Sequence, residues 1–345
     1  MNAKKWISLG VAAICLLSAL LLSSCAGAVK KLPVVCGETN MNEACGIATY
    51  GVNYYSLGVK AGDMAADILL EGKSPATMPV ATDPNPSLTV NPKIANEIGF
   101  SIPVSVWEKA TGTGNQETVK RVESALVTGN GDFTVGILQL VQHNALDSAN
   151  RGFQDQLSVR MAAAGKTVAV LDKNASNEQS NNITIAENFV HQNVDLIYTI
   201  ATSSSQAAAG LTDTIPVVFC AVTDPVGEGL VESMEAPGHN VTGVSDINPV
   251  EQQISLIGEL VGKSDVKIGF LYTAGEPNSV YQVGLAKAVC EKLGYTYVER
   301  GISDINDLEA AFVTLRNAGV DAVYVPTDNT LANGSATIHA VNLGN

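Results

Sequence analysis

Hydroxyl side chains cluster behind an apolar, strand-like run at residues 194–200. Thr202, Ser203 and Ser204 follow this run and precede a helix-like segment. Because the first N–H groups of a helix lack partners within it, this position could bind an anion such as a carboxylate. The same residues could instead form a simple N-cap.

Carboxylates follow three other apolar runs, at Glu38, Asp224 and Asp328. In a partly dry cleft each could accept charge-assisted hydrogen bonds from an ammonium group, or each could cap a helix or hold a loop. Further polar candidates near strand ends are Gln139, Thr223, Asn278, Ser279, Thr327 and Asn329. Leu140, Tyr54 and Tyr272 could form an apolar wall, or belong to the core.

Catalytic patterns are absent from the sequence. His143, His191, His239 and His339 have no metal spacing, and there is no Gly-x-Ser-x-Gly elbow or Walker loop. His143 follows a strand and could touch a ligand. Cys220 could be the nucleophile of a racemase-like α/β enzyme, but its apolar flanks favour inert packing. We therefore predict no catalytic residue, metal or cofactor.

The elements that would position these residues are alternating strands and helices. Apolar runs at 133–138, 167–171, 194–200, 217–222, 266–272, 296–299 and 322–325 alternate with segments of helical period. This alternation is typical of parallel sheets covered by helices on both faces. We predict an α/β fold of two doubly wound parallel-sheet lobes with a hinge, their strand ends facing a cleft. The run 322–325 should pair with the run 32–36.

The first residues have the order of an export signal. Lys4 and Lys5 precede an apolar run at 7–22, and Cys25 follows small residues. This resembles a lipobox, in which Cys25 would be lipidated and anchor the protein outside the cytoplasm of a bacterium. An ordinary signal peptide or a short membrane anchor is the alternative. The net charge of −14 argues against a nucleic-acid partner.

The remaining cysteines match no zinc pattern. Cys220 and Cys290 have apolar surroundings typical of buried thiols. A disulfide between Cys36 and Cys45 is possible in an exported protein.

Six segments carry a family resemblance. They are Gly-Ile-Leu-Gln-Leu-Val-Gln-His-Asn-Ala-Leu-Asp (136–147), Ile-Ala-Thr-Ser-Ser-Ser-Gln (200–206), Ala-Val-Thr-Asp-Pro-Val (221–226), Asn-Val-Thr-Gly-Val-Ser-Asp (240–246), Tyr-Val-Pro-Thr-Asp-Asn-Thr (324–330) and Ala-Thr-Tyr-Gly-Val-Asn-Tyr-Tyr (48–55). The chain resembles the substrate-binding lipoproteins of ABC importers in the tryptophan and tyrosine group, which have the type I periplasmic-binding fold.

The resemblance implies a monomeric, lipid-anchored receptor that captures a free amino acid between two closing lobes and presents it to ABC permease subunits. An aromatic ligand (Trp, Tyr or Phe) is favoured, with its carboxylate at residues 202–204 and its ammonium at Glu38, Asp224 or Asp328. The low aromatic content keeps small aliphatic amino acids open. A nucleoside- or sugar-binding lipoprotein of the same fold is the alternative.

The order of these segments departs from the family. The part resembling 132–345 comes first there, and the part resembling 31–110 follows, so the chain resembles a circular permutation. Two partial copies that pair between molecules are the alternative. The expected parts are a signal and lipobox at 1–25, lobe 2 at 31–48 and 247–345, lobe 1 at 49–86 and 132–246, a crossover tail at 87–110, and at 111–131 a linker joining the family's usual termini.

Overall fold

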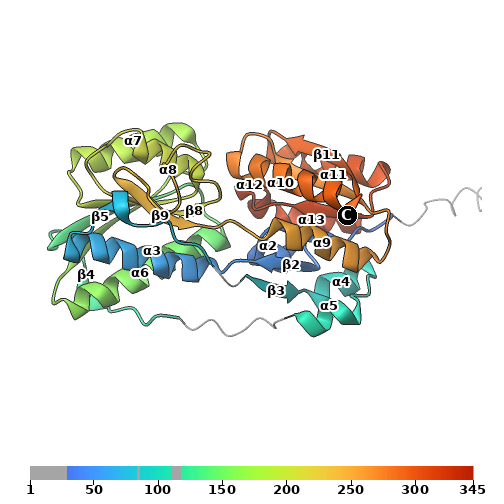
Figure 1. Cartoon of the computed structure of the whole chain (residues 1–345), viewed down its shortest axis with the longest axis horizontal. Helices are drawn as coiled ribbons and strands as arrows, with labels where there is room; N and C mark the ends of the chain where they lie inside the picture. Colours follow the sequence, from blue (N-terminus) through green and yellow to red (C-terminus); the bar gives the residue numbers. More distant parts are fainter. Residues whose placement is uncertain (1–28, 84–85, 111–117, 345) are drawn as a thin grey trace, which may run out of the picture.

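The computed structural model describes residues 29–83, 86–110 and 118–344. Two lobes lie side by side along the long axis of the molecule (Figure 1). Each lobe is built on one six-stranded sheet with helices on both faces. The predicted signal segment and Cys25 lie outside the described residues.

The lobe 1 sheet has the order β4-β6-β5-β7-β8-β9, and all of its paired strands are parallel. Its strands are β4 (Leu126–Val127), β5 (Phe133–Gln139), β6 (Val168–Asn174), β7 (Leu196–Ile200), β8 (Val217–Val222) and β9 (Val241–Ser245). The helices α3 (Tyr54–Glu71) and α6 (Asn144–Ala163) pack on one face. The helices α7 (Gln179–His191) and α8 (Thr202–Ala209) pack on the other.

Two glycines bring α3 and α6 into backbone contact. A Cβ atom at Gly58 would lie 2.0 Å from the carbonyl oxygen of Ala149, and one at Gly152 would lie 2.2 Å from that of Tyr55. Phe153 of α6 stacks on Tyr198 of β7 with ring centroids 3.7 Å apart. Residues before and after the predicted linker therefore share one core.

The lobe 2 sheet has the order β11-β10-β12-β1-β2-β3. Its strands are β1 (Val34–Cys36), β2 (Ala48–Gly51), β3 (Ser87–Val90), β10 (Lys267–Thr273), β11 (Thr296–Ile302) and β12 (Ala322–Val325). The helices α4 (Pro92–Ile98), α9 (Val250–Val261) and α10 (Pro277–Leu293) cover one face. The other face is covered by α2 (Thr39–Ala44), α11 (Leu308–Asn317) and α13 (Ser335–Leu343).

Both sheets contain the same doubly wound order, which is β6-β5-β7-β8-β9 in lobe 1 and β11-β10-β12-β1-β2 in lobe 2. The prediction of two doubly wound parallel-sheet lobes is confirmed, with β3 at the edge of lobe 2 as an antiparallel strand. The predicted pairing of β1 with β12 is also confirmed, with Val34 opposite Val323. Asn342 fixes the chain just before β1, because its amide accepts from Leu32 N (2.9 Å) and donates to Leu32 O (2.7 Å).

Several expected boundaries were wrong. Residues 49–51 belong to β2 and so to lobe 2, and residues 87–110, expected as a tail, contribute β3 antiparallel to β2, α4, and α5 (Val104–Lys109). Within the predicted linker 111–131, β4 pairs with β6 at the edge of lobe 1. Short strands carry little periodicity, and their partners are distant in sequence, so the pattern could not assign them to a sheet.

Candidate functional site

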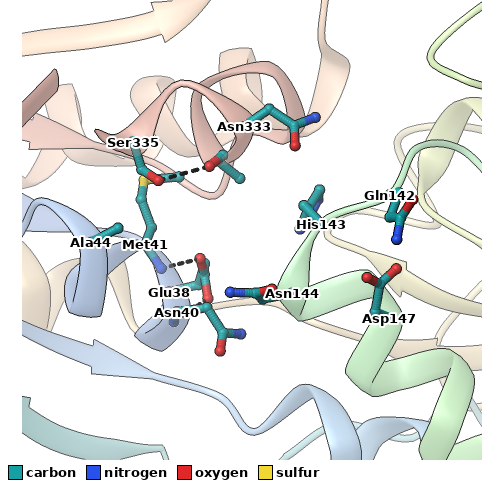
Figure 2. A pocket seen from close by; sticks show the side chains of 11 residues that line it. Glu38, Asn40, Met41, Ala44, Gln142, His143, Asn144, Asp147, Asn333 and Ser335 are labelled. Carbon is teal, nitrogen blue, oxygen red and sulfur yellow. Dashed lines mark hydrogen bonds between the residues drawn. The ribbon is translucent and has the colours of Figure 1, made fainter. Parts of the chain in front are cut away.

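A hollow with a volume of about 320 Å³ lies between the lobes. The start of α6 forms its lobe 1 wall, while α2, α12 (Asn329–Asn333) and α13 form its lobe 2 wall (Figure 2). Its lining residues are Glu38, Asn40, Met41, Ala44, Gln142, His143, Asn144, Asp147, Ala332, Asn333 and Ser335. We call it the outer hollow.

A narrower hollow of about 10 Å³ shares Glu38, His143 and Ala332 with the outer one. We call it the inner hollow. Its other lining residues are Tyr54, Leu146, Ala221, Asp246, Asn278, Thr327, Asp328 and Asn329. Strand ends of both lobes therefore meet here, as the sequence predicts.

A side-chain contact joins the lobes at this point, because His143 Nε2 of lobe 1 lies 3.2 Å from Asn329 Oδ1 of lobe 2. Beside it, Asn248 in the segment that connects β9 with α9 donates through Nδ2 to Thr327 Oγ1 at 2.8 Å. Burial lowers the pKa of His143, although its bond to Asn329 and nearby carboxylates oppose the shift. A neutral ring between the lobes follows from this burial.

Asp328 is held by four donors of lobe 2. Its carboxylate accepts from Thr273 N (2.6 Å), Thr273 Oγ1 (2.9 Å), Ser279 Oγ (2.7 Å) and Leu331 N (2.8 Å). Burial raises its pKa to about 7, reinforced by the negative charge of Glu276. Asp328 thus acts as the N-cap of α12 while it also lines the inner hollow.

Glu38 lines both hollows and is the N-cap of α2. Its carboxylate accepts from Asn40 N at 2.6 Å and from Met41 N. Burial raises its pKa to about 7, which outweighs the stabilisation of the anion by these N–H groups. The carboxylate is therefore poised to ionise if a cation approaches.

Asp246 is a buried carboxylate that the sequence analysis did not single out. It accepts from Tyr54 OH at 2.6 Å and from Thr223 Oγ1 at 2.9 Å, and burial raises its pKa. It directly follows β9, so the rule that selected Asp224 would also have found it. Thr223 thus serves the site through Asp246, whereas Tyr54 both donates to Asp246 and lines the inner hollow itself.

The hydroxyl cluster at α8 has divided roles. Ser204 Oγ donates to Asn182 Oδ1 at 2.8 Å, whereas the buried Thr202 hydroxyl has no partner. The residue before the helix, Ala201, adopts φ +87°, and Ala221 at the end of β8 adopts φ +58°. Such backbone is unusual for alanine and concentrates at functional sites. Thr202, Ser203 and Ser204 line neither hollow.

Four other candidates lie apart from the hollows. Gln139 is buried and bonds to Val141 O, Asp147 and Asn150. Asp224 is half-buried and accepts from Gly227 N. Tyr272 OH donates to Glu299 at 3.4 Å, and Leu140 belongs to the lobe 1 core. Asn278, Thr327 and Asn329 do line the inner hollow.

Cys220 is fully buried, and this burial raises its thiol pKa to about 12. Such a thiol stays protonated at neutral pH, which disfavours a nucleophilic role.

The residues of α2 are not among the candidates predicted from the sequence, because a helix of six residues carries too little periodicity to be recognised. Their side chains at Asn40, Met41 and Ala44 nevertheless form much of the lobe 2 wall (Figure 2).

No helix among residues 29–83, 86–110 and 118–344 combines the length and hydropathy needed to span a bilayer.

Comparison with known proteins gives consistent relatives. A tyrosine-binding protein of Clostridioides difficile (strain R20291) is 39% identical over 207 residues, which are 60% of this chain and 59% of that protein. A Streptococcus pneumoniae ABC domain solved with L-Trp is 37% identical, with a TM-score of 0.56 over 61% of this chain and 70% of that one. A conserved domain protein of Vibrio cholerae is 36% identical, with a TM-score of 0.56 over 61% and 71%.

This chain therefore spans less than two thirds of the length of the tyrosine-binding protein. The model of the family described as ABC transporter substrate binding protein matches residues 15–113 and 134–344, which is most of the sequence. With its two lobes and the hollows between them, the chain belongs to the ABC transporter substrate binding protein family.

Proposed function

We propose that the protein captures a free amino acid, preferably Trp, Tyr or Phe, between its lobes and presents it to an ABC permease. The observation that carries this proposal is the charge of the hollows. Glu38, Asp147, Asp246 and Asp328 line them, and no Lys or Arg is among the lining residues in the described part of the chain. Such a wall suits an ammonium group and disfavours phosphorylated ligands.

The ligand carboxylate would lie toward the start of α8. The unpartnered, buried hydroxyl of Thr202 and the free N–H groups of this helix end support that orientation. The tyrosine-binding relative and the L-Trp complex support an amino acid with an aromatic side chain. Lobe closure on the ligand needs no covalent chemistry.

Calorimetric titration of ligand-stripped protein against amino acids, nucleosides and sugars tests this function. We expect binding of at least one amino acid, and a nucleoside or sugar as the tightest ligand would favour the alternative. Glu38→Gln and Asp246→Asn should each weaken amino-acid binding by at least about tenfold, or about 1.4 kcal/mol. Glu187→Gln makes the same charge change on an exposed face of α7 and should leave affinity unchanged.

We also propose that Cys25 carries the lipid anchor and that the chain is circularly permuted. The relatives above each align with only about 60% of the chain. This is expected of a permuted chain, because an alignment that keeps the order of residues can match only one of the two exchanged parts. Cys25→Ala should release the protein from the membrane fraction. Light scattering should find a folded monomer, whereas an obligate dimer would support pairing of two partial copies.

A further inference from the structure

Two cysteine thiols that the ligand site does not use lie in direct contact in lobe 2. Cys36 ends β1, Cys45 follows α2, and their sulfur atoms are 3.7 Å apart. Both side chains are fully buried. The remaining described cysteines, Cys220 and Cys290, belong to the cores of different lobes.

Gly46 packs directly against this pair of thiols. A Cβ atom at position 46 would lie 2.8 Å from Cys36 Sγ, so a larger residue there would crowd this sulfur atom. The pair is also local in sequence, since it encloses little more than α2. A short link of this kind needs side-chain rotation and little movement of the sheet.

We propose that Cys36 and Cys45 form a disulfide that fastens both ends of α2. The two thiols would exchange with a disulfide of an extracytoplasmic thiol oxidoreductase: one S–S bond forms in this protein, and the oxidant's S–S bond becomes two thiols. Because both cysteines are buried in the folded protein, the exchange takes place while lobe 2 folds.

The disulfide would fix a wall of the ligand site. Glu38, Asn40, Met41 and Ala44, all between the two cysteines, line the outer hollow. A short helix of six residues is marginal by itself, so a covalent link across its ends would limit its fraying. The wall would then be ordered before a ligand arrives.

Peptide mapping of protein recovered from the membrane fraction of cells that export it tests the proposal. Both cysteines lie between Lys31 and Lys60 in a stretch without other Lys or Arg, so trypsin releases them in one peptide. After alkylation in denaturant without reductant, we expect this peptide to be unalkylated and lighter by two hydrogen atoms. Cleavage after Glu38 and Glu43 should leave fragments joined through Cys36 and Cys45. The peptides with Cys220 and Cys290 should be alkylated.

The peptide map is the first arm of the test, and it depends on export, which is part of the proposed function. A second arm tests the disulfide without export. The reduced protein is refolded in a buffer of oxidised and reduced glutathione, and the same bond should form. Reduction should then lower Tm by about 5 °C in the parent and leave the Cys36→Ser/Cys45→Ser variant unchanged. Alkylation of both cysteines in both arms would overturn the proposal, whatever ligand the protein binds.

Discussion

The close contact between α3 and α6 can be tested by adding a single methyl group to its backbone, through Gly58→Ala. At Gly58 the new Cβ of alanine would lie 2.0 Å from the carbonyl oxygen of Ala149, well inside van der Waals contact. The obstacle is helix backbone, so no side chain can rotate away. The helices would have to separate, opening a core that includes Leu57, Phe153 and Tyr198.

Gly284 provides a matched control in α10. It is exposed, and a Cβ there would meet nothing within 4 Å. Gly284→Ala should therefore stabilise the protein by about 0.5–1 kcal/mol, the usual gain from helix propensity. Gly58→Ala gains the same propensity but adds an overpacking cost of about 3 kcal/mol, so the expected net loss is about 2 kcal/mol.

Urea unfolding followed by far-UV circular dichroism measures both variants. The two substitutions should shift the midpoint in opposite directions with similar m-values. Gly152→Ala repeats the test from the other helix, since its Cβ would lie 2.2 Å from the Tyr55 carbonyl oxygen. If Gly58→Ala stabilises the protein as Gly284→Ala does, the close α3–α6 packing is refuted, and with it the placement of residues 54–71 in lobe 1.

Three further predictions concern the hollows. Asp328→Ala should lower the free energy of unfolding by about 3–5 kcal/mol, because four donors lose their buried acceptor. Asp224→Ala should lower it by less than about 1 kcal/mol, and equal losses for the two variants in urea unfolding would contradict this prediction. Amino-acid affinity should rise between about pH 6 and 8, and binding should release a proton, because the ammonium group of the ligand lowers the raised pKa of Glu38. Calorimetry in buffers of different ionisation enthalpy measures this proton release, and an affinity that does not depend on pH argues against the prediction. His143→Ala and Asn329→Ala should each increase the rate of ligand release about tenfold in stopped-flow, and the double variant should release ligand no faster than either single variant. Additive effects of the two substitutions on this rate would show that the bond between the lobes is unimportant.

The arrangement of the lobes was predictable because long elements carry clear periodicity. Strands such as β5 and β7 are buried over most of their length, and their order along the chain indicated parallel sheets. The sheet to which β2 and β3 belong could not be predicted, since each has four residues and its position depends on long-range pairing. The helix α2 was missed for the same reason: six residues carry too little pattern.

The site was predictable where a side chain directly follows a strand. Asp328 and Glu38 reached the hollows in this way. Tyr272 did not, because alternate residues of a strand point to opposite faces, and its neighbour Thr273 is the one that contacts Asp328. Until the arrangement of the sheet is known, the sequence does not show which face of a strand lies toward the ligand site.

The pairing of β1 with β12 has a consequence for how the chain folds as it is made. Leu32 and Asn342, which exchange two hydrogen bonds beside this pair, are 310 residues apart in sequence. The centre of the lobe 2 sheet therefore stays incomplete until nearly all described residues have been synthesised, while every strand of the lobe 1 sheet is present by residue 245. Contacts of such long range form slowly and leave strand edges exposed meanwhile. We expect lobe 1 to fold first and the nascent β1–β2 segment to be the part most in need of a chaperone.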